Sequence, residues 1–314
     1  MKIVITGALG HIGSHLLRDL PSQFADCEIV LIDNMMTQRY ASLFSLPSRA
    51  RFCFIENDVA EMDLEPFIEG ANGVIHLAAI TDAANSFDKA DLLERNNLGS
   101  TRRVAEACAK LGVPMLLPST TSVYGTQGSL VDEDCRLEDL TPQSPYARVK
   151  LKEEALLAGM GAARGLRFII CRFGTIFGIS PGMRFHTAVN KFCWQAVFGQ
   201  PVTIWSTAYD QKRPYLDLLD AARSIAFILE KDLFDRSIYN VVTLNATPRN
   251  ITDVIREFVP DLTITMVDSP IMNQLSYEVS NRRFRDQGFS FEGDLRRGIH
   301  DTINLLRGSN GHDR

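Results

Sequence analysis

The stretch KIVITGALGHIGSHLL at residues 2–17 constrains the fold most strongly. A short apolar run leads into a turn that contains Gly7, Gly10 and Gly13, and an amphipathic run follows. Glycine in such a turn permits positive φ and lets the backbone approach a ligand closely. The helix that follows presents free N–H groups to an anion such as a pyrophosphate. A strand, this turn and a helix, in that order, predict a dinucleotide-binding unit.

Short apolar runs alternate with longer amphipathic runs through the first half of the chain. We expect strands at 2–6, 28–32, 51–55, 73–77, 113–118 and 167–173. We expect helices between them, including 11–20, 92–111 and 146–161. This alternation builds a parallel sheet with helices on both faces, where continuous Val, Ile and Leu runs are buried. The predicted fold class is therefore α/β, a Rossmann-type doubly wound parallel sheet.

The alternation weakens after residue 172. We expect one more strand at 237–243, returning to the main sheet, and helices at 185–198, 251–259, 281–287 and 295–306. The predicted organisation is a cofactor-binding domain at 1–172, to which 213–245 returns. A smaller, discontinuous C-terminal substrate-binding region comprises 173–212 and 246–314.

Charge and composition exclude several classes of function. The formal net charge of -5 argues against a nucleic-acid-binding surface. No N-terminal segment resembles a signal peptide, and no apolar run approaches the roughly 18 residues of a membrane span. The six cysteines lack CxxC spacing, and His11 and His15 lack the glutamate of an HExxH zinc motif. We therefore expect a cytoplasmic protein with no membrane partner and no metal site.

Asp33 ends the second expected strand, 20 residues after Gly13. An acidic side chain there accepts hydrogen bonds from the adenosine ribose and repels a 2′-phosphate. The alternative is that Asp33 and Asn34 merely begin a turn. In combination with the glycine turn, Asp33 predicts NAD rather than NADP as the cofactor.

Tyr146 and Lys150 lie four residues apart in TPQSPYARVK. On a helix they share one face, so both head groups can reach one site. A tyrosine with a pKa near 10 is a poor base, but a neighbouring ammonium and a positive nicotinamide lower that pKa. Tyr146 could then take a proton from a substrate hydroxyl while hydride leaves the same carbon. This spacing also arises by chance, and its place downstream of a glycine turn argues against chance here.

The chain resembles the extended short-chain dehydrogenase/reductase superfamily, in particular nucleotide-sugar epimerases and dehydratases of the UDP-galactose 4-epimerase type. The resemblance covers nearly the whole chain. It is carried by TGALGHIG at 6–13, DVA at 58–60, VIHLAA at 74–79, NNLGST at 96–101, PSTTSVYG at 118–125, TPQSPYARVK at 141–150, RFGTIFG at 172–178 and RPYLDLLD at 213–220.

The resemblance gives the hydroxyl-rich stretch PSTTSVYG a function, whereas the residues alone also allow a strand that ends in a polar loop. It implies that Thr120 bonds the reacting hydroxyl and completes a Thr-Tyr-Lys triad with Tyr146 and Lys150. It implies cofactor contacts from Gly7, Gly10, His11, Ile12, Gly13, Asp33, Asn34, Asp58, Val59, Leu77, Ala78, Ala79, Asn97, Ser119, Tyr146, Lys150 and Phe173. It implies substrate contacts from Thr81, Thr120, Thr121, Tyr146, Thr175, Arg184 and Arg213.

Several positions bear on the substrate. Arg213 matches the position that pairs with the substrate diphosphate, and a guanidinium suits phosphate geometry. Thr175 stands where family members often have Asn, and WSTAYDQKR at 205–213 lacks their glycine-rich turn. Arg184 could face a phosphate or a sugar carboxylate, or could be a solvated loop residue.

Thr121 and Ser122 stand where related dehydratases and decarboxylases carry acidic residues. A hydroxyl cannot replace a carboxylate as acid or base near neutral pH, so we expect neither elimination nor decarboxylation.

The leading hypothesis is an NAD-dependent nucleotide-sugar epimerase, acting at C4 by transient hydride transfer on a nucleotide-diphosphate sugar. The alternative is an NAD(P)-dependent nucleotide-sugar 4-ketoreductase or dehydrogenase that consumes its cofactor. A third reading, a non-catalytic NAD sensor, leaves the Tyr-Lys pair without a purpose. The resemblance also implies a homodimer, formed through 92–111 and 146–161.

Overall fold

A seven-stranded parallel sheet forms the centre of the computed structural model, which describes residues 1–81, 90–125, 130–268 and 277–309. The strand order is β11-β7-β5-β4-β1-β2-β3, and every neighbouring pair is parallel. The strands are β1 (Lys2–Thr6), β2 (Glu28–Asp33), β3 (Arg51–Glu56), β4 (Gly73–His76), β5 (Met115–Thr120), β7 (Phe168–Phe173) and β11 (Ile238–Val241).

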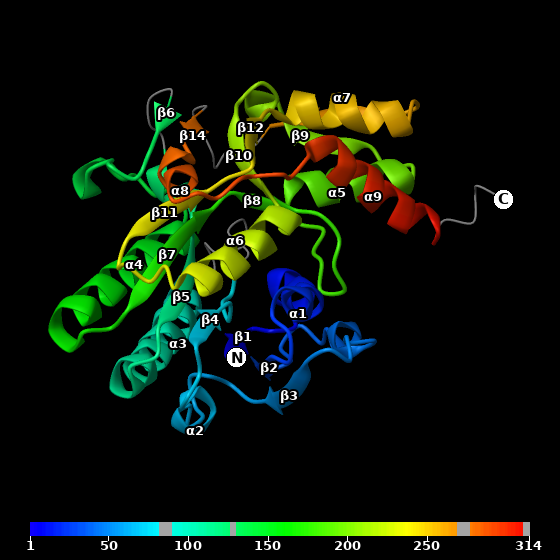
Figure 1. The fold of residues 1–314 in the computed structure, drawn as a ribbon. Helices are drawn as coiled ribbons and strands as arrows, with labels where there is room; N and C mark the ends of the chain where they lie inside the picture. The colour runs from blue at the N-terminus through cyan, green and yellow to red at the C-terminus, as the bar shows by residue number, and fades with distance from the viewer. Residues whose placement is uncertain (82–89, 126–129, 269–276, 310–314) are drawn as a thin grey trace.

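Helices cover both faces of this sheet (Figure 1). Side chains alternate across β1, so Ile3 and Ile5 join one core with α1 and α6, whereas Val4 joins another with α3 and α4. The helices are α1 (His11–Gln23), α2 (Glu65–Ile68), α3 (Ala90–Leu111), α4 (Pro145–Arg164) and α6 (Leu218–Lys231). The arrangement confirms the predicted Rossmann-type doubly wound sheet.

The C-terminal part adds smaller sheets and a helical layer. Its strands are β8 (Thr175–Phe177), β9 (Val202–Trp205), β10 (Arg213–Asp217), β12 (Leu244–Ala246), β13 (Ile264–Val267) and β14 (Glu278–Val279). The last of these pairs with β6 (Leu130–Val131) from the first half of the chain. Its helices are α5 (Ala188–Val197), α7 (Pro248–Phe258), α8 (Arg282–Asp286) and α9 (Leu295–Arg307). Four short 3-10 turns complete the described elements: η1 (Tyr40–Leu43), η3 (Thr121–Tyr124), η4 (Leu137–Asp139) and η5 (Ser206–Ala208).

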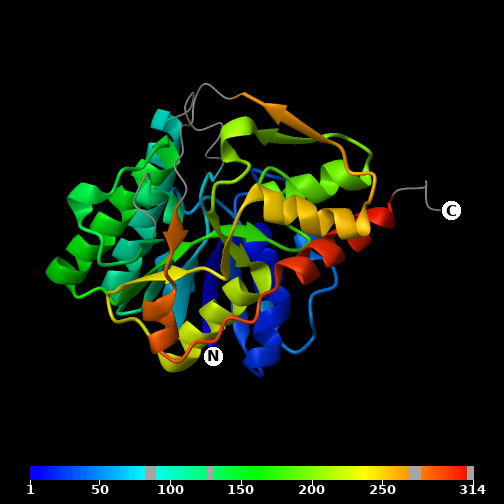
Figure 2. The ribbon, with the colours of Figure 1, turned by 90° about the horizontal axis from the view of Figure 1, so that it is seen from above.

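The smaller elements surround a core of their own. β8, β10 and β12 form a three-stranded sheet, and β9 pairs with β13. Seen from above in Figure 2, α7 and α9 lie beside each other at one end of the molecule, away from α3 and α4. Phe177, Ile251 and Ile299 are among the residues buried between these elements.

The structure contains one helix that was not expected, and it does not test the expected division into domains. Helix α6 was not expected, although Asp217 caps it by accepting from the Leu219 N–H and its apolar face is buried against α1. The division into domains stays a prediction, because within 213–245 β11 pairs with β7 whereas β10 pairs with β8 and β12. In the described ranges, no helix has the length and apolar character that a membrane crossing requires.

Candidate active site at the carboxyl edge of the sheet

The parallel strands bring most of the predicted site residues to one edge of the sheet. The turns after β1, β2, β4 and β5 all leave the sheet at its carboxyl edge, where α/β proteins bind ligands. A cavity of about 260 Å³ opens there. The predicted residues that line it are Gly7, Gly10, Asp33, Asn34, Asp58, Val59, Leu77, Ala78, Ala79, Thr81 and Arg184.

The glycine turn has the close packing and the open helix end that a diphosphate requires. Gly7 has a φ of +63°, and a Cβ there would lie 2.6 Å from the Ala78 nitrogen. A Cβ on Gly13 would lie 2.3 Å from the Ala8 oxygen. Gly10 is the N-cap of α1, with no side-chain capping bond and no acidic residue in the first turn. The first N–H groups of α1 are therefore available to an anion.

His11 and Ile12 follow the turn but face the protein interior. His11 is buried, and its Nε2 lies 2.8 Å from the Gly178 carbonyl oxygen. Burial lowers the pKa of His11 to about 3, so the imidazole is neutral at physiological pH. Ile12 packs against the main core. Their side chains therefore hold α1 in place, and a cofactor contact from this segment would come from its backbone.

Asp33 begins a turn, as one of its two interpretations predicted, and its role toward the adenosine ribose stays a prediction. One carboxylate oxygen accepts from the Leu9 N–H at 3.0 Å and the other from the Met35 N–H at 2.9 Å. The side chain thus begins a turn and also ties the glycine turn to the end of β2. Asn34 continues this edge by donating to Asp58 at 2.9 Å.

Arg39 is a cavity residue that the sequence analysis missed. It lines the same cavity as Asp33, and its Nη1 lies 3.7 Å from the position of a Cβ on Gly10. Burial lowers the pKa of Arg39, and the Asp33 charge opposes that shift. The sequence signal for Arg39 was a basic residue six positions after Asp33.

A network behind β4 fixes the cavity wall. The Ala78 N–H donates to the Thr6 hydroxyl, which lies 2.7 Å from His76 Nδ1. His76 Nε2 contacts the Thr101 hydroxyl at 3.2 Å. Burial lowers the pKa of His76 to about 3, and the nearby Lys150 charge acts in the same direction. The predicted residue Asn97 adds hydrogen bonds to both the N–H and the carbonyl of Ile80.

Helix α4 carries Tyr146 and Lys150 in its first two turns. Ser144 caps the helix by accepting from the Ala147 N–H at 3.2 Å, so Tyr146 lies at the helix entrance. The Lys150 ammonium is buried, and its Nζ lies 2.7 Å from Oε2 of Glu153. The sequence analysis did not single out Glu153, although its i, i+3 spacing from Lys150 was readable.

The expected lowering of the Tyr146 pKa depends on the Lys150 ammonium together with a positive nicotinamide, and the protein alone supplies only the ammonium. In the protein alone, burial raises the pKa of Tyr146. Lys150 lowers this pKa, Glu153 raises it again, and Arg184 lowers it. The net direction is upward, because burial penalises the phenolate and Glu153 offsets part of the ammonium's effect.

The hydroxyl cluster after β5 divides into different environments. Thr120 caps η3 by accepting from the Ser122 N–H at 3.2 Å. Ser119 donates to Glu154, which also forms a bidentate pair with Arg172 at 3.1 and 2.7 Å. Thr121 donates to the carbonyl of Phe173 at 3.3 Å. Of these three residues, Thr120 is thus the one whose hydroxyl bonds only a neighbouring backbone N–H within the described ranges.

The predicted substrate residues fall into two groups. Thr81 and Arg184 contact each other at the cavity, and the Arg184 charge acts on Tyr146. Arg213 and Thr175 lie on the three-stranded sheet instead. Arg213 stacks over the ring of Tyr277, with its guanidinium carbon 5.2 Å from the ring centre, and donates to Gln211 at 3.0 Å.

Tyr277 connects the second group to the strand end. Its hydroxyl donates to the Thr121 carbonyl at 3.3 Å. The sequence analysis missed Tyr277, because no local pattern relates it to residues 156 positions earlier in the chain.

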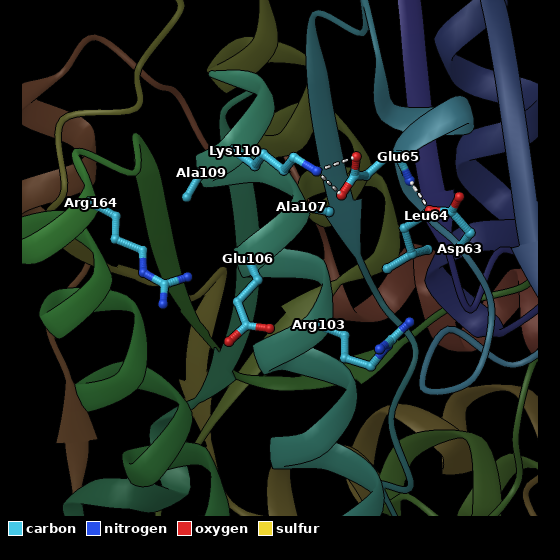
Figure 3. Close-up of a pocket in the computed structure, with 9 residues that line it drawn as sticks. All are labelled: Asp63, Leu64, Glu65, Arg103, Glu106, Ala107, Ala109, Lys110 and Arg164. Atoms are coloured by element: carbon cyan, nitrogen blue, oxygen red, sulfur yellow. Dashed lines mark hydrogen bonds and ion pairs between the residues drawn. The ribbon is translucent and has the colours of Figure 1, made fainter.

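A second cavity, of about 570 Å³, lies away from these residues among α2, α3 and the end of α4 (Figure 3). Its lining mixes acidic and basic side chains, and Lys110 forms an ion pair with Glu65 at 2.7 Å. Both of these side chains are exposed, which is typical of a solvated surface. This cavity contains none of the predicted site residues.

Comparisons with known proteins are consistent across sequence and structure. A family model described as "NAD dependent epimerase/dehydratase family" matches residues 3–241. The "Uncharacterized UDP-glucose epimerase YtcB" of Bacillus subtilis is 30% identical over 240 residues, covering 74% of this chain and 73% of that protein.

A plant relative is longer than this chain. The "Trifunctional UDP-glucose 4,6-dehydratase/UDP-4-keto-6-deoxy-D-glucose 3,5-epimerase/UDP-4-keto-L-rhamnose-reductase RHM3" of Arabidopsis thaliana is 28% identical over 319 residues. The match covers 96% of this chain and 46% of that protein, so the chain spans about half the length of that relative.

A solved structure is similar over its full length. UDP-glucuronic acid 4-epimerase from Bacillus cereus, in complex with UDP-glucuronic acid and NAD, has a TM-score of 0.86 at 26% identity. The match covers 98% of this chain and 100% of that one.

Proposed function

The chain belongs to the NAD-dependent epimerase/dehydratase family, and from that premise we propose that it is an NAD-dependent nucleotide-sugar epimerase acting at C4. The observation that carries the proposal is the placement of Tyr146 and Lys150 on one face of α4, with the charge of cavity residue Arg184 acting on Tyr146. The similar structure from Bacillus cereus is that of a 4-epimerase, which supports the position of the reaction.

The cavity residues fit NAD. The uncapped N-terminus of α1 and the glycine turn suit a diphosphate. Asp33 and Asn34 line the far side of the same cavity, where the carboxylate would accept from ribose hydroxyls. Asp58 and Val59 would border the adenine, and Leu77 to Ala79 the ribose and diphosphate. When bound, NAD supplies a reversible acceptor for hydride.

The chain's own residues would handle the proton. Tyr146 takes the proton of the sugar hydroxyl as the carbon is oxidised and returns it when the carbon is reduced from the other face. The Lys150 ammonium stabilises the phenolate form of Tyr146. Thr120 holds the reacting hydroxyl in line with Tyr146 by a hydrogen bond. Because the proton and the hydride both return to the sugar, no cofactor is consumed.

Thr121 and Ser122 restrict the outcome of the reaction. Neither side chain can abstract a proton from C5 or assist the departure of a group from C6. The proposed reaction therefore ends in a product with the mass of the substrate. The dehydratase and reductase activities in the name of the plant relative define the competing outcomes.

The test is a panel of nucleotide sugars incubated with the purified chain and NAD. We expect a new anomeric NMR signal, an unchanged mass, and no solvent deuterium at C5 or C6 in D2O. Loss of water or carbon dioxide from the substrate would overturn the epimerase proposal. Net accumulation of NADH would support the ketoreductase or dehydrogenase instead. Absorbance of a denatured extract would report whether NAD stays bound through purification.

We also retain the homodimer as a proposal. The helices on which the resemblance places the contact, α3 and α4, pack against each other along the same side of the sheet (Figure 1). Light scattering on the purified chain is the direct measurement, and a monomer at micromolar concentration would contradict the proposal.

A further inference from the structure

Glu153 is a buried carboxylate with an unusual set of contacts. Its side chain is 0% exposed, and its Oε2 lies 2.7 Å from Nζ of Lys150. Within the described ranges, its other oxygen, Oε1, has no hydrogen-bond partner. A buried polar atom without a partner costs free energy, and such atoms in native proteins call for an explanation.

A purely structural role does not explain these contacts well. A buried ion pair stabilises a fold only when geometry is excellent and the remaining lone pairs are satisfied. Among the described residues, Glu153 has a partner for one of its oxygens and pairs with one cation, Lys150. Its position relative to Tyr146 and Lys150, at i+7 and i+3, places all three on one face of α4.

We propose that Glu153 is a positioning residue that fixes the direction of the Lys150 ammonium and moderates its charge toward Tyr146. The inference rests on the proposed function of Tyr146 and Lys150. An ammonium has three N–H donors, and Glu153 occupies one of them. The other two are thereby aimed for the cofactor ribose and for the Tyr146 side of the site.

Of the acidic residues near Lys150, Glu153 has the largest effect on the pKa of Lys150. Burial lowers the pKa of Lys150, but Glu153 and Tyr146 outweigh burial, so that pKa is raised and Lys150 remains an ammonium. Three other ionisable groups face the pair. His76 from β4 is neutral, Arg184 from the loop before α5 lowers the pKa of Tyr146, and Glu154 raises that of Lys150.

Removing the charge of Glu153 has a defined sign. A negative charge near Tyr146 disfavours the phenolate, so its loss lowers the pKa of Tyr146. The phenolate fraction at a given pH then increases. Glu153→Gln keeps the shape and one acceptor for Lys150 while removing the charge.

The experiment follows the tyrosine ring carbons by NMR in the full-length chain with NAD added. The Tyr146 signal is assigned by its loss in Tyr146→Phe, and the titration is compared among wild type, Glu153→Gln and Glu154→Gln. We expect Tyr146 to titrate at lower pH in Glu153→Gln, with a larger shift than in Glu154→Gln. Tyr146 titrating at the same or a higher pH would overturn the proposal. Glu153→Asn, which also removes the charge and keeps an amide acceptor, carries the same prediction if the glutamine variant fails to fold.

Steady-state kinetics separate the effect of Glu153 on the orientation of the Lys150 ammonium from the effect of its negative charge on Tyr146. The acid limb of the turnover profile should move to lower pH in Glu153→Gln, with its plateau reduced less than about tenfold because one hydrogen bond to Lys150 is kept. Glu153→Ala should lose more of the plateau, since Lys150 then has no anchor. Equal plateaus in both variants would contradict the positioning role.

The two proposals fail in different ways. A wild-type chain without epimerase activity would refute the proposed function, while the Tyr146 titration would still test Glu153. Normal epimerase activity with superimposable titrations would refute the role of Glu153 alone.

Discussion

Glu153 and Glu154 are adjacent on α4, and both are buried against a basic side chain, yet their surroundings differ. Glu154 accepts from Ser119 and from two nitrogens of Arg172, so both of its oxygens are satisfied. Glu153 contacts only Lys150, and one of its oxygens lacks a partner in the part of the chain that the structure describes. Of these adjacent glutamates, Glu154 thus has both carboxylate oxygens hydrogen-bonded and Glu153 has one, within the described residues.

The pair at Glu154 extends into a brace across the sheet. Arg172 on β7 stacks over the ring of Tyr124, 4.9 Å from its centre. Tyr124 in turn donates to Asn240 on β11 at 2.9 Å. A fully satisfied buried ion holds strands together, whereas a partly satisfied one next to the proposed base leaves its charge to act on that base. We infer that the first supports the fold and the second supports the chemistry.

The largest expected effect separates the two glutamates by stability. Glu154→Gln should lower the free energy of unfolding by about 3–5 kcal/mol, because it leaves the buried Arg172 guanidinium without a counter-charge. Glu153→Gln should lower it less, since the carboxylate that it replaces accepts one hydrogen bond, whereas that of Glu154 accepts three. Urea denaturation of both variants measures the difference. An equal or larger loss of unfolding free energy in Glu153→Gln would contradict the proposed difference between the two glutamates.

Tyr146→Phe tests whether Tyr146, the residue on which the Glu153 charge acts, is the proposed acid–base group. Turnover should fall at least about a hundredfold, the usual scale for loss of a general acid–base group. NAD binding and the free energy of unfolding should change little, because the ring and its packing remain. Steady-state kinetics and calorimetry supply both measurements. Near-normal turnover would refute the proposed triad.

Asp33→Ala tests whether a carboxylate with both oxygens hydrogen-bonded can also contribute to the proposed site. Asp33 accepts from two backbone N–H groups and lines the cavity. We expect NAD affinity to fall about tenfold or more, since charge-assisted hydrogen bonds are lost. The preference between NAD and NADP should shift toward NADP. Asn34→Ala, which loses the hydrogen bonds to Asp58 and to the Met36 N–H but removes no charge, is the comparison variant in calorimetry. Tighter binding of NADP by the wild type would show that Asp33 was misinterpreted.

Thr120→Ala should have the smallest effect. It removes one hydrogen bond to the reacting hydroxyl and leaves Tyr146 in place, so turnover should fall about tenfold. Thr121→Ala is the control, because the Thr121 hydroxyl bonds the Phe173 carbonyl instead. A larger loss in the Thr121 variant would reassign the sheet-edge hydroxyl.

Local patterns were sufficient to predict the main sheet and its first helices. β1 begins and ends where the apolar run at 2–6 predicted, and α3 and α4 overlap the expected helices at 92–111 and 146–161. Strands buried on both faces must be apolar throughout, so this information is present in each segment by itself. The glycine turn was predictable for the same reason, since its chemistry is local.

The C-terminal sheet was not predictable in this way. β8, β10 and β12 are three to five residues long, and they are defined by pairing between residues up to 40 positions apart in sequence, as in Tyr215 with Thr175. Segments that short have no periodicity of their own to read. Helix α6 is different, because Asp217 before an apolar run was a readable start signal.

The sequence by itself determined which groups the site contains, and the tertiary structure decided their electrostatic states. The spacing of Tyr146, Lys150 and Glu153 was present in the sequence and placed them on one helix face. Only the packing of α3 and α4 against the sheet buried that face, and in the protein alone burial raises the pKa of Tyr146. Likewise, Ser119 and Arg172 come from different strands and meet Glu154 only when β5 and β7 pair. The physical reason is that covalent spacing fixes neighbours along the chain, whereas desolvation and long-range partners depend on which surfaces the fold brings together.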